Sequence, residues 1–475
     1  MASDPHRWRI LAVVAAAFFM TILDVSIVNV ALPSIGKDLE FSRENLQWVI
    51  TAYAIAFGGF LLLGGRAADL LGRRRVFAVG VAIFTLASLV CGLSQSEGML
   101  IAARAVQGFG AAIISPAALS IVMTSFEEGA DRNKALGIWG ALGGSGAAVG
   151  VLAGGILTKY LGWEWIFFVN VPVGAAVLLL TPRIVPESRR EGAEAHYDAL
   201  GAVLVSGGLA LLVYTISRAP DVGWGTARTI LLLVASVALL VAFLVNERRI
   251  DDPLLPFSIF RVRTLAGANV VGLLLGAVIF ANFFLLTLYV QNVLGYSALK
   301  AGVTFVATAG TAVLAAGAAQ ALTTKFGPKP IIVIGLLLLT GAMIWYAQIP
   351  VDGKYASDLL PGYLMVGVGI AFAYVPVSIA ALAGVVEREA GLASGLINTS
   401  QQIGGAIGVA VASTVFTSRF NTLVHGGKAL PNALTGGYGA AFWALAVFAV
   451  AAVIAALTLI RREELADSPA TAPIA

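Results

Sequence analysis

Long apolar stretches recur along almost the whole chain and limit its fold more than any other feature. A helix that crosses the hydrocarbon core of a bilayer needs about 20 mostly apolar residues. The chain has fourteen such stretches, joined by links too short for a separate soluble domain. The sequence therefore predicts an all-α polytopic membrane protein with spans near 9–33, 46–65, 76–95, 98–125, 134–158, 163–181, 199–217, 228–246, 265–292, 300–322, 328–348, 357–383, 394–418 and 437–460.

The charge content supports a membrane location. Asp, Glu, Lys and Arg make up 12% of the 475 residues, whereas 59% are hydrophobic. A soluble globular domain carries about 25% charged residues. So few charges would leave most of a water-exposed surface apolar, so the solvent for most of this chain is expected to be lipid.

Composition also excludes several classes of function. Three histidines and one cysteine are too few for a metal cluster or a disulfide framework. The chain lacks the Gly-x-x-x-x-Gly-Lys-Ser/Thr phosphate loop of ATP-driven pumps and any evident nucleophile–base set. We therefore expect that the protein is not an enzyme and that it has neither a nucleic-acid partner nor a cofactor. Protons are the expected coupling ion, on account of Asp24, an acidic residue inside the first span. The first apolar run is longer than a signal-peptide core and contains Asp24, which favours an uncleaved span.

The distribution of Lys and Arg predicts the orientation of the spans. With a cytoplasmic N-terminus, the inner segments hold 20 of these residues and the outer loops hold 9. Cytoplasmic loops are the ones enriched in Lys and Arg. We therefore expect both termini in the cytoplasm.

Glycines and a few other residues recur in the same order in two parts of the chain. Gly72, Gly80 and Thr85 return 255 residues later, and Gly146 and Gly150 return 258 residues later. Such duplication is typical of transporters. It predicts two six-helix halves with two helices inserted between them, divided as 1–181 for the N-terminal half, 182–264 for the insertion, 265–460 for the C-terminal half and 461–475 for a tail.

Small residues at helical spacing predict close helix packing in both halves. Gly146, Gly150 and Gly154 lie four residues apart, as do Gly404 and Gly408. Residues at this spacing share one helix face and let a neighbouring backbone approach closely.

Two charged side chains lie well inside the predicted spans. Asp24 and Arg104 are both expected in the outer half of the membrane, where each would cost a few kcal/mol if it faced lipid. A carboxylate in a partly dry cavity can carry protons, so Asp24 is a candidate proton site and Arg104 a candidate to tune it. A structural ion pair for Asp24 and helix bracing by Arg104 remain alternatives.

Other polar or aromatic side chains inside the spans are candidates for lining a cavity. Each is equally suited to hydrogen bonding or packing between helices. These candidates are Asn29, Tyr53, Gln107, Asn282, Asn398 and Gln401.

Several motifs resemble one family. The run at 23–33, Leu-Asp-Val-Ser-Ile-Val-Asn-Val-Ala-Leu-Pro, resembles the first-span signature of the fourteen-helix drug:proton antiporters of the major facilitator superfamily. The loop at 65–75 is similar to that superfamily's motif between spans two and three. The run at 104–110, the run at 163–172 and the stretch at 391–405 also resemble the family.

The resemblance implies an exporter that alternates between inward and outward openings while protons enter. Asp24 would then be the proton or cation site, and Arg104 would support coupling. Gly65, Asp69, Gly72 and Arg73 would form a cytoplasmic gate, although the Arg cluster of this loop also suits topology control alone.

The resemblance further implies a bacterial inner membrane, a small amphipathic or cationic substrate, and function as a monomer. Span five reads Gly150-Val151 where the family's antiporter motif usually has Gly-Pro, which leaves export direction open. A transporter of one metabolite, and a lipid-handling or sensory membrane protein, remain as alternatives.

Overall fold

A computed structural model describes residues 5–126, 130–188, 198–250, 253, 263–382 and 390–460. These residues are almost entirely helical, and no strand occurs among them. The elements are α1 (Pro5–Asp38), α2 (Arg43–Leu46), α3 (Trp48–Leu71), α4 (Arg73–Gly92), α5 (Glu97–Ser125), α6 (Ala130–Tyr160), α7 (Trp165–Phe168), α8 (Asn170–Ile184), α9 (Ala199–Val222), α10 (Ala227–Glu247), α11 (Arg263–Asn292), α12 (Ala298–Thr304), α13 (Val306–Phe326), α14 (Pro328–Tyr346), η2 (Tyr355–Leu359), α15 (Leu360–Leu382), α16 (Ala390–His425) and α17 (Leu430–Leu459).

The helices account for the predicted spans. Eleven of them are long and apolar enough to cross a membrane, and the described parts of three more are shorter apolar helices at Trp48–Leu61, Val149–Tyr160 and Leu200–Ile216. Together they match the fourteen predicted stretches, which confirms a polytopic all-α membrane protein.

The chain forms two compact units. Unit 1 comprises Met1–Gly207 with Leu239–Leu255, and unit 2 comprises Gly208–Ala238 with Pro256–Ala475. This division does not test the sequence-based boundaries at 181, 264 and 460, which stay predictions.

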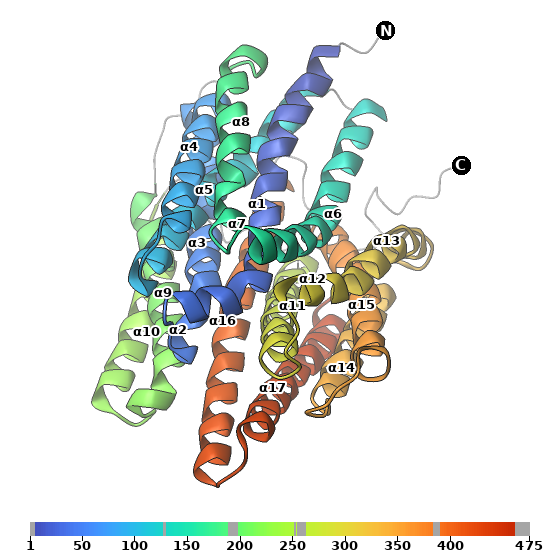
Figure 1. The fold of residues 1–475 in the computed structure, drawn as a ribbon. Helices are drawn as coiled ribbons and strands as arrows, with labels where there is room; N and C mark the ends of the chain where they lie inside the picture. The colour runs from blue at the N-terminus through green and yellow to red at the C-terminus, as the bar shows by residue number, and fades with distance from the viewer. Residues whose placement is uncertain are drawn as a thin grey trace. The chain divides into compact units, whose positions relative to one another are not determined.

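Within unit 1, α5 packs against α3 and α4, and α1 packs against α6, α5 and α8 (Figure 1). Aromatic and β-branched side chains fill the space between these helices. Phe77, Phe84 and Ile114 are fully buried there.

Within unit 2, the packing follows the same plan. The helix α15 packs against α13 and α14, and α11 packs against α16 and α17. The turns before α4 and α14 also match, because each uses a glycine with positive φ, Gly72 at 106° and Gly327 at 80°. Glycine adopts such angles without steric cost, which explains why it recurs at this turn.

The predicted glycine stripes lie at helix crossings. A Cβ on Gly154 would stand 2.7 Å from the carbonyl oxygen of Ile27 on α1, and one on Gly150 would strike the Ser26 hydroxyl. On α16, a Cβ on Gly404 or Gly408 would strike a backbone carbonyl of α11. The absence of side chains thus lets α6 approach α1 and lets α16 approach α11.

Candidate functional site

Asp24 lies on α1, and its carboxylate is completely buried in unit 1. One carboxylate oxygen, Oδ2, accepts a charge-assisted hydrogen bond of 2.5 Å from Arg104 Nη1 on α5. The other, Oδ1, accepts hydrogen bonds from Gln107 Nε2 at 2.8 Å and from Asn170 Nδ2 at 3.1 Å. All three partners are donors, so the arrangement suits an ionised carboxylate. Asp24 therefore joins three helices, α1, α5 and α8.

Arg104 is as deeply buried as its partner, with 1% of its surface exposed. Its Nε donates to the carbonyl oxygen of Val49 on α3 at 2.9 Å. The guanidinium carbon lies 4.4 Å from the ring centre of Tyr53 and 5.7 Å from that of Phe167. Both rings are close enough for a cation–π contact. The cation is therefore held by a carboxylate, a carbonyl and two aromatic rings.

Gln107 connects the ion pair to α4. Its Oε1 accepts from Arg104 Nη1 at 2.6 Å and from the Cys91 thiol at 3.6 Å. Its Nε2 donates to the Ser88 hydroxyl at 2.7 Å as well as to Asp24. The Ser88 hydroxyl in turn donates to the carbonyl oxygen of Phe84. These contacts fix which end of the amide faces the carboxylate.

The energetics of this network depend on its pairing. Removing one partner from a buried ion pair costs about 3–5 kcal/mol, because a charge is left without compensation in a medium of low dielectric constant. Movement of α5 relative to α1 would break this pairing. A proton on Asp24 would remove its charge and weaken the bonds from Arg104, Gln107 and Asn170 together. The packing of α1 against α5 and α8 therefore depends on the charge of Asp24.

The structure adds residues that sequence reasoning missed. Ser88, Cys91 and Phe167 all contact the Asp24–Arg104–Gln107 network. Ser88 and Cys91 lie three residues apart, on one face of a helix. That spacing was the available signal, but small polar residues at it are common in membrane helices.

The predicted gate motif lies at the junction of α3 and α4. Gly72 has a φ of 106°, and the Arg73 amide donates to the carbonyl oxygen of Ser188 at 2.9 Å. A Cβ on Gly65 would stand 3.4 Å from Pro116 on α5. The side chain of Asp69 lies outside the described residues, so its place in a gate stays a prediction.

Glu187, which sequence reasoning also missed, holds this junction in place. Its Oε1 accepts from the Arg74 amide at 3.1 Å, at the first turn of α4. Its Oε2 lies 3.6 Å from Arg74 Nε and 3.5 Å from Arg75 Nε. A carboxylate at a helix N-terminus is stabilised by the unpaired amides and by the helix dipole. Glu187 therefore connects the residues that follow α8 to the first turn of α4.

The candidate cavity residues fall into separate places. Of the six, Tyr53 and Gln107 lie in the network around Arg104, whereas the Asn29 amide donates to Val25 on its own helix at 2.9 Å. Asn282 on α11 and Gln401 on α16 are buried in unit 2, and Asn398 lies on α16. Their role in substrate binding stays a prediction.

The described helices contain no group of three or more His, Cys, Asp or Glu side chains placed to hold a metal ion.

Membrane-spanning helices in two units with similar helix packing, one of which contains a buried ion pair, define a multi-pass membrane protein. The chain belongs to the Major Facilitator Superfamily, whose sequence profile matches residues 14–409. The family resemblance seen in the motifs is thereby confirmed.

Two relatives are similar over nearly their whole length. The puromycin resistance protein pur8 of Streptomyces alboniger is 42% identical over 479 residues, covering 99% of this chain and 95% of its own. The cephamycin export protein CmcT of Amycolatopsis lactamdurans is 39% identical over 452 residues, covering 94% and 91%. Both names concern antibiotic resistance or export.

A solved structure supports the fold. The bacterial homologue of the human lysosomal transporter Spinster, in an inward-facing conformation, superposes with a TM-score of 0.69 at 18% identity, covering 98% of this chain and 99% of the other. This likeness concerns the fold alone.

Proposed function

We propose that this protein exports amphipathic or cationic antibiotics from the bacterial cytoplasm in exchange for protons, by alternating access. One observation carries the proposal. Asp24 is fully buried, and its carboxylate holds α1, α5 and α8 together through Arg104, Gln107 and Asn170.

Protonation of Asp24 supplies the coupling step. An ionised Asp24 keeps the three donors in place and compensates the charge of Arg104. When a proton neutralises the carboxylate, Arg104 loses its counter-ion and the hydrogen bonds weaken, which favours a different packing of α1 against α5. Release of the proton on the other side of the membrane restores the first packing. Each charge that moves down a potential of 100 mV supplies about 2.3 kcal/mol.

The names of the relatives support the substrate class. A puromycin resistance protein and a cephamycin export protein each match more than nine-tenths of this chain. We assign the protein to the inner membrane, with both termini in the cytoplasm because Lys and Arg are concentrated in the loops on that side. A monomer contains the complete Asp24 network.

Reconstituted proteoliposomes test the coupling. A pH-sensitive dye in the lumen would report proton movement when puromycin or a cephamycin is added to the wild-type protein. We expect Asp24→Asn to reduce this drug-driven proton movement at least tenfold, because an amide cannot take up the proton.

Asp38→Asn is the matched control. Asp38 lies on the same helix but is exposed at its end, where it accepts from Trp163 Nε1 at 2.9 Å. It should keep wild-type proton movement. Undiminished coupling in Asp24→Asn would reject Asp24 as the carrier, and resistance in cells without drug-driven proton movement would reject proton exchange itself.

A further inference from the structure

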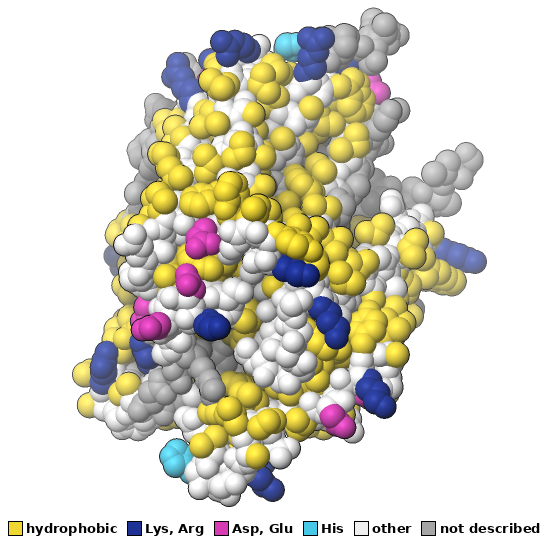
Figure 2. Space-filling view, viewed as in Figure 1, with side chains coloured by type: hydrophobic (Ala, Val, Ile, Leu, Met, Phe, Trp, Pro, Cys, Tyr) yellow, Lys and Arg dark blue, Asp and Glu magenta, His cyan; other side chains and the backbone are white. Residues whose placement is uncertain are grey.

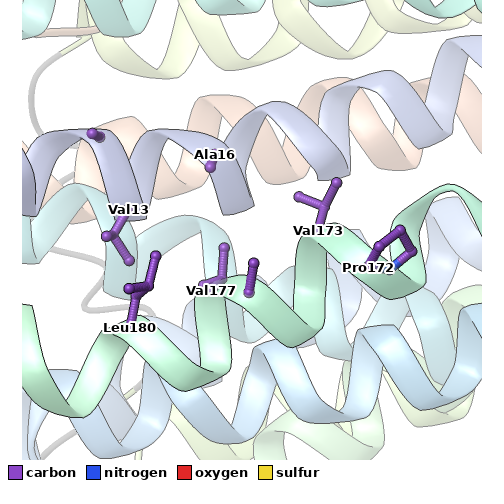
Figure 3. Close-up of a pocket in the computed structure, with 8 residues that line it drawn as sticks. Val13, Ala16, Pro172, Val173, Val177 and Leu180 are labelled. Carbon is purple, nitrogen blue, oxygen red and sulfur yellow. The ribbon is translucent and has the colours of Figure 1, made fainter.

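An apolar groove runs along unit 1 between α1 and α8 (Figure 3). It encloses about 440 Å³, a volume within the range of ligand pockets. Every residue that lines it is apolar: Ala12, Val13 and Ala16 on α1, and Pro172, Val173, Ala176, Val177 and Leu180 on α8.

The groove has a buried floor and an exposed rim. Val13 and Val177 lie at the floor, where 6% and 3% of their surfaces are exposed. Val173 and Leu180 form part of the rim, with 37% and 43% exposed. In Figure 3 the side chains of Val13 and Leu180 extend toward one another across the groove. An open apolar groove of this kind suits a flexible hydrocarbon chain.

The length of the groove fits one leaflet of a bilayer. Residues 172–180 span about 12 Å along α8 at 1.5 Å per residue. One leaflet contributes about half of a hydrocarbon core of about 30 Å. The groove begins two residues after Asn170, which contacts Asp24, and continues toward the end of α8. An acyl chain inserted from that end would therefore reach close to the middle of the membrane.

The end of the groove is basic. Arg9 precedes Val13 by four residues on α1, and Arg183 follows Leu180 by three on α8, so each arginine shares a helix face with the groove. Both arginines are exposed. Figure 2 shows Lys and Arg side chains gathered where α1 begins and α8 ends, above a broad apolar surface. Basic residues next to an apolar groove match the two chemical parts of an anionic phospholipid.

We propose that this groove binds an anionic phospholipid of the cytoplasmic leaflet, with one acyl chain between α1 and α8 and the phosphate group at Arg9 and Arg183. This site is separate from the Asp24 network and does not depend on proton exchange. The two arginines would repel a cationic substrate, which favours the lipid as the occupant. A bound chain would fill the space between α1 and α8 and so favour the packing described here.

Native mass spectrometry of the purified protein in a mild detergent tests this site. Dioleoyl phosphatidylglycerol and dioleoyl phosphatidylcholine have the same acyl chains and differ in headgroup charge. We expect the wild-type protein to retain one phosphatidylglycerol, at least fivefold more often than phosphatidylcholine. Ala16→Phe and Ala176→Phe should each abolish retention of this lipid by filling the groove. The double variant Arg9→Gln/Arg183→Gln should remove the preference for phosphatidylglycerol.

Matched controls separate the groove from general surface effects. Leu179→Phe adds the same ring on α8 at a residue that is 65% exposed and does not line the groove. Arg249→Gln removes an exposed arginine beyond the end of α10. Both should retain lipid as the wild type does, and the thermal unfolding of each groove variant would show whether it is folded.

Three results would overturn the proposal. Equal retention in Ala176→Phe and Leu179→Phe would show that the lipid binds elsewhere. Equal retention of the two lipids by the wild type would remove the role of the arginines. Competitive displacement of phosphatidylglycerol by a cationic antibiotic would identify the groove as a substrate site instead.

Discussion

The centres of the two halves share a scaffold but differ in chemistry. A Cβ on Gly110 of α5 would stand 3.1 Å from the carbonyl oxygen of Gly80, and a Cβ on Gly369 of α15 would stand 3.0 Å from that of Gly335. The same helix crossing therefore occurs in both halves. Six residues before the glycine, the first half has Arg104 and the second has Tyr363.

The acidic partner is also present in one half alone. The residue 258 positions after Asp24 is the neutral Asn282. Tyr363 is fully buried, and its hydroxyl lies 3.0 Å from that of Thr304. Aromatic rings of Phe305 and Tyr346 surround it at centroid distances of 5.2 and 6.2 Å. The glycines that let helices cross thus recur in both halves, whereas the charged pair Asp24 and Arg104 is replaced by the neutral Asn282 and Tyr363.

The largest expected difference between the halves concerns the two central side chains. Arg104→Met leaves Asp24 buried without a counter-ion, and we expect a loss of about 3–5 kcal/mol in the free energy of unfolding. Tyr363→Phe removes one neutral hydrogen bond, for an expected loss of about 1 kcal/mol. Denaturant titration of the purified proteins would measure both.

A double variant sharpens this prediction. Asp24→Asn/Arg104→Met removes both charges, so it should recover much of the stability that Arg104→Met loses. Equal losses in Arg104→Met and Tyr363→Phe would mean that the ion pair contributes no more than a neutral contact, and the contrast between the halves would fail.

The glycine crossings are expected to differ by a smaller amount. A Cβ on Gly404 would strike the carbonyl oxygen of Leu273, and the backbone cannot move aside cheaply. A Cβ on Gly146 would meet Ile22 Cγ2 at 2.7 Å, the end of a side chain that can rotate. Overpacking costs about 1–3 kcal/mol, and alanine returns up to about 1 kcal/mol through its helix propensity.

We therefore expect Gly404→Ala to lower the free energy of unfolding by about 1–2 kcal/mol and Gly146→Ala by less than about 1 kcal/mol. Unfolding curves measured under the same conditions would compare the two. A larger loss in Gly146→Ala would show that the α1–α6 crossing is the tighter one.

Most of the fold was predictable from hydropathy. Stretches expected at 98–125 and 265–292 are helices at Glu97–Ser125 and Arg263–Asn292, because long apolar runs in lipid must satisfy their backbone within one helix. The structure adds three details. The first span was expected to end at Pro33, yet α1 continues to Asp38 with the proline inside it. Two predicted stretches each contain one residue outside the regular helices, Val169 and Phe305, and each still forms one candidate span, Trp165–Ile184 and Ala298–Phe326.

The candidate site was only partly predictable. Asp24 and Arg104 were evident because charge in an apolar span is costly. Their direct contact was not, because it depends on which faces of α1 and α5 meet. Ser88, Cys91 and Glu187 were missed for the same reason, since a polar residue at a helix face or end acquires its role from a neighbour distant in sequence.

The smallest expected effect concerns Tyr346, the residue 255 positions after Cys91. The Tyr346 hydroxyl is buried and has no hydrogen-bond partner among the described residues, whereas the Cys91 thiol donates to Gln107 at 3.6 Å. Removing an unpaired buried hydroxyl relieves a desolvation cost, and Tyr346→Phe keeps the ring contacts with Tyr363 and Phe442.

We expect the Tyr346→Phe protein to have an unchanged free energy of unfolding or to be up to about 1 kcal/mol more stable. We expect Cys91→Ala to lower the free energy of unfolding by about 1 kcal/mol, because it removes a weak hydrogen bond and leaves a small cavity. Thermal unfolding would compare them. A clear loss in Tyr346→Phe would mean that the second half also contains a polar network at its centre, and the contrast with the Asp24 network would be one of charge alone.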